Sequence, residues 1–462
     1  QGLLLRWFHP SLLQLRWAIL PWELLLVAGL YLLALRLGFP RGQAFLLGAL
    51  LSGWRLPLNF QTFSSYYALA AWVMGLAFLV LRLPERPAPV PLEGREKVAW
   101  FWLGVMGALV FFFKQSMGIF FAMASGLLLL DRFGEREFGL PPRLAVLGRK
   151  LAAAACLLGL LVLLRHHLSL KYLLGFLVPP ALAMLSLERS RSRAGGSPTT
   201  AGRSALVWWL AGGLLPMAAL VGCYAARGSA GAWWHGVFLR PQLHLLTGIW
   251  PLREISWEGG AILLLLLAPL CLSRRFFPAR IGKALAAGAA AGALLLLART
   301  GFSRGVFEGT WQWATYSVPL AVSCASLLRP PRSFPARTVL LSAPFLYLVL
   351  YPLSCDVYLA YALPLGWLLL WHLGREILAP SPLALRAILL SQVLLLAIPY
   401  GFLAKHSLQQ NSARVERPPV FQGMLLPPDT VRQMRSLAAL VHRETGPGET
   451  IFAYPDCADL PL

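Results

Sequence analysis

Long apolar runs separated by short polar segments dominate the chain, and the run from Val98 to Leu130 is the most informative. It extends over 33 residues and holds a single ionisable side chain, Lys114, near its middle. The hydrocarbon core of a bilayer is about 30 Å thick and needs ~20 apolar residues per helix, so this run is too long for one ordinary span. We therefore predict two helices that reverse direction at Lys114-Gln115-Ser116. The alternative, one tilted helix, would place the Lys114 ammonium group in mid-bilayer at a cost of several kcal/mol.

The same pattern recurs along the sequence and predicts an all-α polytopic membrane bundle of roughly 12–14 transmembrane helices. The predicted spans cover residues 18–37, 44–54, 67–81, 98–113, 117–130, 151–164, 172–187, 204–224, 261–273, 284–298, 313–328, 338–353, 359–373 and 386–404. Residues 1–17 carry Trp and Arg on a half-apolar background, which is typical of a segment at the membrane interface. We therefore expect a transmembrane helical domain over residues 1–404.

Basic residues are distributed unevenly among the segments between these runs. Six segments hold 22 Lys and Arg in total, and the five that alternate with them hold 8. The richer segments are 82–97, 131–150, 188–203, 274–283, 329–337 and 374–386; the poorer ones are 114–116, 165–171, 225–260, 299–312 and 354–358. Because basic loops stay in the cytoplasm, the poorer segments are predicted to face outward, together with the C-terminal tail.

Composition agrees with a membrane protein and argues against other classes. The chain is 58% hydrophobic and 13% charged, with 41 Lys and Arg against 19 Asp and Glu. The net charge of +22 does not indicate a nucleic-acid partner, because the arginines form short clusters between apolar runs, as loops that contact lipid headgroups do. The six cysteines show no spacing typical of a zinc or redox site, so no metal site is predicted.

The tail after Ala404 has a different character. Asp429 is suited to cap a helix that Gly446-Pro447-Gly448 would end, and residues 450–454 are typical of a strand. The apolar face of this helix would consist of Met434, Leu437, Ala438 and Val441. Residues 405–462 therefore predict the beginning of a small extracytoplasmic α/β domain, which we expect to be cut off at residue 462.

Polar side chains that the charge pattern assigns to the outer face are the candidates for a functional site. They are Lys114, Gln115, Arg165, His166, Arg304 and Asp356. Lys and Arg bind phosphate through charge-assisted hydrogen bonds, and a carboxylate can act as a general base toward a hydroxyl group. A lysine that snorkels at a helix end is the structural alternative for Lys114. We predict that Lys114 and Asp356 line one outward-opening cavity, partly roofed by residues 233–258, since a shared aqueous cavity avoids several separately buried charges.

Four stretches carry a resemblance to a known class of enzymes. They are KQSMG (114–118), GSAGAWWHGVFLRPQL (228–243), YPLSCDVYLAYALP (351–364) and ETGPGETIFAYPD (444–456). In these stretches the chain resembles the integral-membrane glycosyltransferases of the GT-C class. The branch concerned is the bacterial one, which includes the family 39 protein mannosyltransferases and the aminoarabinose transferases of lipid A.

This resemblance implies a multi-pass protein of the bacterial inner membrane that transfers a sugar from a polyprenyl-phosphate donor to a lipid, glycan or protein acceptor on the outer face. It places the usual catalytic acid in the first outer loop, which we expect to lie upstream of Gln1, so the catalytic residue is unknown and Asp356 is the candidate within the sequence. Lys114 matches a position at which the class keeps a basic residue. The cofactor stays open, with a divalent cation as one alternative.

Two other membrane functions remain open as alternatives. One is a transporter or flippase of a lipid-linked oligosaccharide, and the other is an O-antigen polymerase or ligase. Transporters commonly contain internal repeats, and we find no convincing self-similarity in the sequence. Polymerases and ligases concentrate function in one large arginine-rich outer loop, whereas the outer charges here are dispersed. Both observations favour the transferase.

Overall fold

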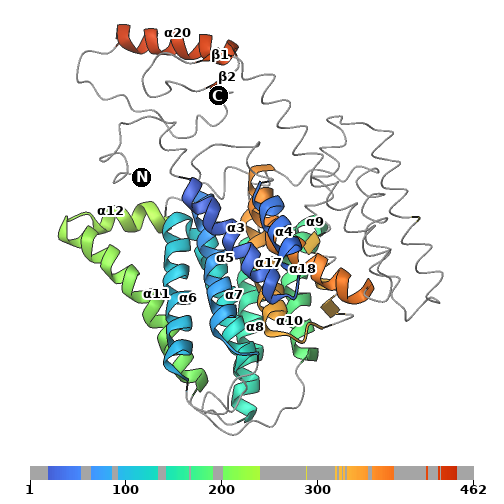
Figure 1. The fold of residues 1–462 in the computed structure, drawn as a ribbon. Helices are drawn as coiled ribbons and strands as arrows, with labels where there is room; N and C mark the ends of the chain where they lie inside the picture. Colours follow the sequence, from blue (N-terminus) through green and yellow to red (C-terminus); the bar gives the residue numbers. More distant parts are fainter. Residues whose placement is uncertain are drawn as a thin grey trace.

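The computed structural model describes residues 19–53, 64–85, 92–133, 142–165, 168–190, 201–239, 330–351, 356–378 and 428–444. It also describes residue 288 and the short pieces 318–319, 322–324, 326–327, 413–414 and 425–426. These residues are almost all helical, which confirms the all-α class for this part of the chain (Figure 1).

The described helices of the bundle overlap the predicted spans, except for those at residues 230–239, which lie in the segment 225–260 that was expected to be an outer loop. They are α3 (Leu20–Arg36), α4 (Arg41–Gly53), α5 (Ser64–Arg82), α6 (Gly94–Phe113), α7 (Gln115–Arg132), α8 (Pro142–Leu164), α9 (Leu170–Tyr172), the π-helix η3 (Leu173–Leu177), α10 (Val178–Ser190), α11 (Ala201–Ala226), α12 (Ala230–Trp234), the π-helix η4 (His235–Leu239), α17 (Phe334–Tyr347), the 3₁₀ helix η5 (Leu348–Leu350) and α18 (Asp356–Leu378). The predicted spans at 261–273, 284–298, 313–328 and 386–404 lie outside the described residues, apart from a few positions.

Within the described residues, two helices are long and apolar enough to cross a membrane. They are α6 and α11, of 20 and 26 residues. Other apolar helices, such as those within α5, α8 and α17, are shorter. The count of 12–14 spans therefore stays a prediction, and so does the assignment of the two sides of the membrane.

Helices α5, α6, α7 and α8 run in alternating directions, so the bundle has two ends (Figure 1). At one end, which we call the Lys114 end, Trp22 of α3 contacts both Tyr67 of α5 and Phe113 of α6. At the other, the Arg132 end, the guanidinium group of Arg132 lies 4.3 Å from the ring centroid of Phe334. Parts of three segments rich in basic residues, at 84–85, 131–132 and 334–337, meet at the Arg132 end, and the α6–α7 connection lies at the other end of α7.

Helices α6 and α7 form the predicted hairpin. Phe113 ends α6, Lys114 alone has an extended backbone (φ −154°, ψ 109°), and Gln115 begins α7. The helices pack closely beside this turn, because a Cβ atom at Gly118 of α7 would collide with Phe111 of α6. The prediction of two helices rather than one is therefore confirmed.

Glycines also set the approach of α11 to α6. A Cβ atom at Gly104 of α6 would collide with the carbonyl oxygen of Trp209 and would lie 2.7 Å from the Gly213 nitrogen. At Gly212 of α11 it would collide with the carbonyl oxygen of Phe101. Small residues that bring two backbones together are a common means of association between membrane helices.

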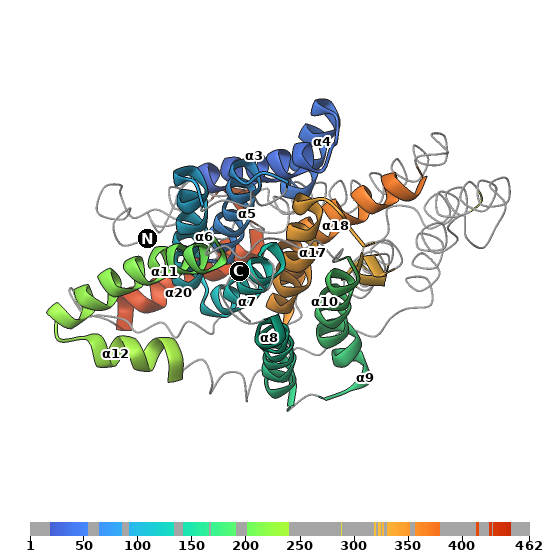
Figure 2. The ribbon, with the colours of Figure 1, turned by 90° about the horizontal axis from the view of Figure 1, so that it is seen from below.

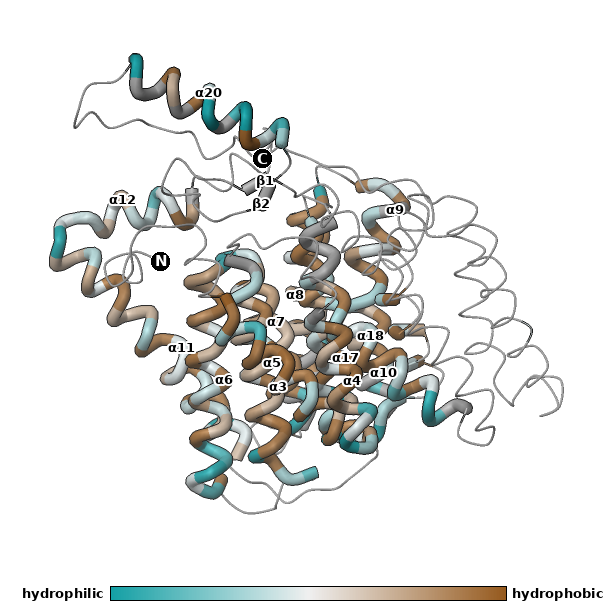
Figure 3. The backbone as a smooth tube through the Cα atoms, turned by 45° about the horizontal axis from the view of Figure 1, so that its top comes forward, coloured by the Kyte–Doolittle hydropathy of each residue, from teal (hydrophilic) through white to brown (hydrophobic). Residues whose placement is uncertain are grey.

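The outward faces of the helices carry many exposed, large apolar side chains. Examples are Leu24 on α3, Phe45 on α4, Leu158 on α8, and Leu214 and Leu215 on α11, all of them about 60% exposed. Figure 3 shows hydrophobic positions along the length of these helices, with hydrophilic positions towards helix ends and on α20. Contiguous exposed apolar surface of this kind is typical of a protein that contacts lipid.

The tail contains the helix that the sequence predicted, α20 (Pro428–Glu444). Val431 on this helix is buried, whereas Leu437 and Leu440 are exposed. The described strands, β1 (Ala413–Arg414) and β2 (Leu425–Leu426), form a two-residue antiparallel pair. The strand predicted at 450–454 lies outside the described residues, so an α/β domain over 405–462 stays a prediction.

Candidate functional site

The α6–α7 turn presents a basic side chain at the positive end of a helix. Lys114 and Gln115 are both half-buried, and the Lys114 side chain makes no capping hydrogen bond to the first turn of α7. Unpaired backbone N–H groups and the helix dipole make such an end attractive to anions. Because an ammonium group stands at the same point, the start of α7 combines two sources of positive potential.

Aromatic rings surround the approach to this turn. Trp22, Tyr67 and Phe113 contact one another, with centroid separations of 5.5 Å (Trp22–Tyr67), 5.2 Å (Trp22–Phe113) and 5.3 Å (Tyr67–Phe113). Phe113 directly precedes Lys114 in the chain. The cluster packs α3, α5 and α6 against one another directly beside the turn.

The carboxylate of Glu23 is buried at the same end of the bundle, and the sequence analysis did not select this residue as a site candidate. Glu23 of α3 is 9% exposed, and its Oε2 accepts a hydrogen bond of 2.7 Å from the Ser52 hydroxyl of α4. Glu23 follows Trp22, whose ring touches Phe113. The sequence did contain a signal for Glu23, because it is the one acidic residue in the apolar run 18–37. A buried carboxylate needs a polar partner, so its position in such a run indicates a specific contact.

Asp356 begins α18, and its side chain lies outside what the structure describes. Helix α17 starts at the Arg132 end and leads to η5, so α18 begins at the Lys114 end. Further along α18, Tyr361 contacts Tyr66 of α5, with 4.8 Å between the ring centroids. The neighbouring Tyr67 contacts Phe113, so the first turns of α5 connect α18 with the Lys114 turn. A cavity shared by Lys114 and Asp356 stays a prediction.

The remaining predicted site residues are only partly described. Arg165 is exposed at the end of α8. The Leu163 carbonyl nearby accepts a 2.9 Å hydrogen bond from the Tyr351 hydroxyl, which places the end of α8 beside the segment after η5. His166 and Arg304 lie outside the described residues, as does most of the predicted roof at 233–258.

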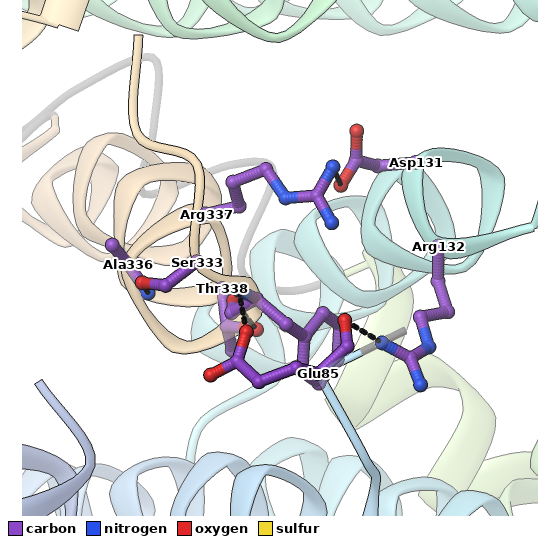
Figure 4. A network of polar contacts seen from close by, with 8 residues as sticks. Glu85, Asp131, Arg132, Ser333, Ala336, Arg337 and Thr338 are labelled. Atoms are coloured by element: carbon purple, nitrogen blue, oxygen red, sulfur yellow. Dashed lines mark hydrogen bonds and ion pairs between the residues drawn. The ribbon is translucent and has the colours of Figure 1, made fainter. Parts of the chain in front are cut away.

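A second polar cluster occupies the Arg132 end (Figure 4). Asp131 pairs with Arg337 at 3.5 Å, and the Arg132 guanidinium donates to the carbonyl oxygens of Glu85 at 3.0 Å and Pro84 at 2.6 Å. The Glu85 carboxylate accepts from the backbone N–H of Phe334 at the start of α17. These contacts join three segments far apart in sequence, and their charged groups are used within the fold. We therefore interpret this cluster as structural.

We find no protein-family model, curated protein or solved structure that matches the chain. Among the described residues, no group of three or more His, Cys, Asp or Glu side chains is arranged to hold a metal ion. The candidate site therefore rests on its own geometry. It consists of the turn at Lys114 and Gln115, the aromatic cluster beside it, and the Glu23–Ser52 pair.

Proposed function

We propose that the protein is a membrane-embedded glycosyltransferase that uses a polyprenyl-phosphate-linked sugar donor, and that the donor phosphate binds at Lys114. The observation that carries the proposal is a half-buried lysine at the N-terminus of α7, within a bundle whose described outer surface is apolar. The resemblance of KQSMG and the three other stretches to GT-C enzymes supplies the reaction class.

The electrostatics of the turn favour a phosphate. The amide groups of the first turn of α7 and the Lys114 ammonium group both attract a negatively charged ligand. Charge-assisted hydrogen bonds of this kind contribute ~1.5–3 kcal/mol each.

The surroundings of the turn suit a ligand with a long hydrocarbon tail. Large apolar side chains are exposed on neighbouring helices, including Leu24 on α3 and Ile119 on the second turn of α7. A polyprenyl chain could extend along such a surface while its phosphate stays at the bundle end. The acceptor would then approach from the side of the predicted outer segments.

The test measures binding of undecaprenyl monophosphate to the purified full-length chain. Lys114→Ala and Lys114→Gln should each weaken binding by about tenfold to a hundredfold, equivalent to the loss of one charge-assisted contact. The neutral amide of glutamine cannot balance the charge of a phosphate. Lys97→Ala is the matched control, because Lys97 is also half-buried on α6 but lies at the opposite end of that helix.

Equal affinities of the Lys114→Ala and Lys97→Ala proteins would remove Lys114 from the site. Equal binding of undecaprenol and undecaprenyl monophosphate to the wild type would show that no phosphate is recognised. A wild-type chain that moves labelled donor between the leaflets of proteoliposomes without transferring its sugar would support the transporter alternative instead.

A further inference from the structure

A short aromatic helix follows α11 and turns back toward the Lys114 end of the bundle. It consists of α12 and η4, which we together call the aromatic helix. Figure 1 and the view from below in Figure 2 both show this helix lying crosswise to the bundle helices. The Phe238 ring reaches Phe111 in the last turn of α6, with 6.0 Å between the ring centroids. The aromatic helix therefore connects the end of α11 with the end of α6.

The turn between α11 and the aromatic helix is held by its own backbone and by one pair of rings. The Ser229 N–H group donates to the Tyr224 carbonyl oxygen at 2.9 Å. The Gly228 N–H group donates to the Ala225 carbonyl oxygen, also at 2.9 Å. Gly228 has a φ of 68°, which is the left-handed conformation that this type of helix end requires. The Trp233 ring stacks on Tyr224 at 6.0 Å, so local contacts fix the change of direction.

Helix α11 indicates where the membrane surface lies relative to this turn. Arg203 near its start and Arg227 directly after its end are both exposed. The residues between them, 204–226, include no charged side chain and would extend over ~35 Å, slightly more than the ~30 Å hydrocarbon core of a bilayer. Charged side chains avoid the hydrocarbon, so the two arginines bracket it. The aromatic helix begins at Ala230, just beyond Arg227, and therefore starts at the level of the membrane surface.

The composition and the exposure of the aromatic helix suit that level. Its α12 and η4 parts have five residues each, and His235 is their one ionisable residue. Together they have about half of the ~20 apolar residues that a membrane span needs. No residue of α12 is buried, and the Trp234 side chain is 55% exposed. An apolar helix that is too short to span and is not buried is typical of an interfacial segment, where Trp and Tyr are enriched.

We propose that α12 and η4 form an interfacial helix that lies in the plane of the membrane surface on the Lys114 side, with Trp234 inserted among the lipid headgroups. The partner of this surface is the lipid bilayer itself, because the apolar surface of α11 leads directly to it. Through Phe238 and Phe111, the helix would keep the end of α6 at the same level. The proposal does not rest on the proposed transferase function.

The experiment measures depth in the full chain, reconstituted without its native cysteines in dioleoylphosphatidylcholine liposomes. Single cysteines carry nitroxide spin labels, whose accessibility to oxygen and to a water-soluble nickel complex reports their depth. Labels at Ala232 and Gly236, both exposed and on one face of the helix, should report the same depth, at the headgroups. A label at the exposed Ala218 of α11 should lie in the hydrocarbon, and one at the exposed Ser436 of α20 should lie in water.

A second measurement tests the role of Trp234. In the protein labelled at Ala232, Trp234→Ala should raise the accessibility to the nickel complex about two- to threefold, because it removes the exposed interfacial ring. Trp208→Ala is the matched control, since Trp208 is also exposed, at 40%, but lies near the start of α11. It should leave the depth of the label unchanged.

The outcomes separate the position, the orientation and the anchor. A label at Ala232 that is as accessible to nickel as one at Ser436, or as deep as one at Ala218, would overturn the interfacial position. A difference in depth of ~6 Å between Ala232 and Gly236 would show a helix that stands along the membrane normal. Equal effects of Trp234→Ala and Trp208→Ala would overturn the insertion of Trp234.

Discussion

Replacing Gly212 with alanine adds one methyl group where α11 crosses α6. The new Cβ atom would collide with the carbonyl oxygen of Phe101 and would lie 2.8 Å from its carbonyl carbon and 3.1 Å from its Cα atom. All three neighbours belong to the backbone of α6, so no side chain can rotate to make room. The two helices must therefore move apart.

The magnitude follows from two opposing effects. Alanine in place of glycine favours a helix by ~0.5–1 kcal/mol, whereas overpacking a close contact costs ~1–3 kcal/mol. We expect Gly212→Ala to lose about 1–2 kcal/mol of stability overall. Gly222→Ala, on the same helix, gains the helical preference without the clash, because its Cβ atom would meet nothing within 4 Å. The two substitutions should therefore change stability in opposite directions.

The assay is thermal unfolding of the detergent-solubilised full chain, followed by a thiol-reactive dye or by intrinsic fluorescence. Gly212→Ala should unfold several degrees below the wild type, and Gly222→Ala at or slightly above it. A Gly212→Ala protein as stable as Gly222→Ala would refute the close crossing of α6 and α11.

Two further predictions concern the bundle ends. Arg337→Leu removes the arginine that pairs with the buried Asp131 carboxylate, and should destabilise the protein by about 3–5 kcal/mol in thermal unfolding. Adding Asp131→Asn should restore part of that loss. Equal stability of the single and double variants would contradict a buried ion pair. In intact cells, an impermeant thiol reagent should label a cysteine placed at Ala230 and leave one at Gly195 unlabelled, in a chain without its native cysteines; the opposite pattern would invert the predicted orientation.

Local features of the sequence were enough to predict the α6–α7 hairpin and most of the described helices, but not α12 and η4, which lie in a segment expected to be a loop. A 33-residue apolar run exceeds one span, and its only ionisable residue is the one at which the chain turns. The length and the hydropathy of a run depend only on neighbouring residues, so both can be determined from the sequence without knowledge of the fold. The sides of the membrane predicted from the basic residues stay a prediction.

Contacts between distant segments could not be predicted in the same way. The backbone N–H of Phe334 donates to the Glu85 carboxylate across 249 residues, and neither position has a local pattern that names its partner. Glu23 was visible as an acid in an apolar run, but its partner Ser52 follows from how α4 packs on α3. Gly104 and Gly212 allow the backbones of α6 and α11 to approach closely, and this role is recognised only in the structure, where the two helices cross. The sequence alone identified Lys114 as a site candidate, but the residues that lie around Lys114 could be identified only from the structure.

The single-residue turn at Lys114 limits how the bundle can move. With no loop between them, α6 and α7 cannot slide past one another, and α11 is locked to α6 by its glycine crossing. Outside α6 and α7, the described helices with an interior proline include α17 and α18, where Pro344 and Pro364 interrupt the backbone hydrogen bonding, so these helices bend more easily than α6 and α7. Through α7, the Lys114 turn is therefore connected rigidly to the Asp131–Arg337 ion pair at the other end of the same helix.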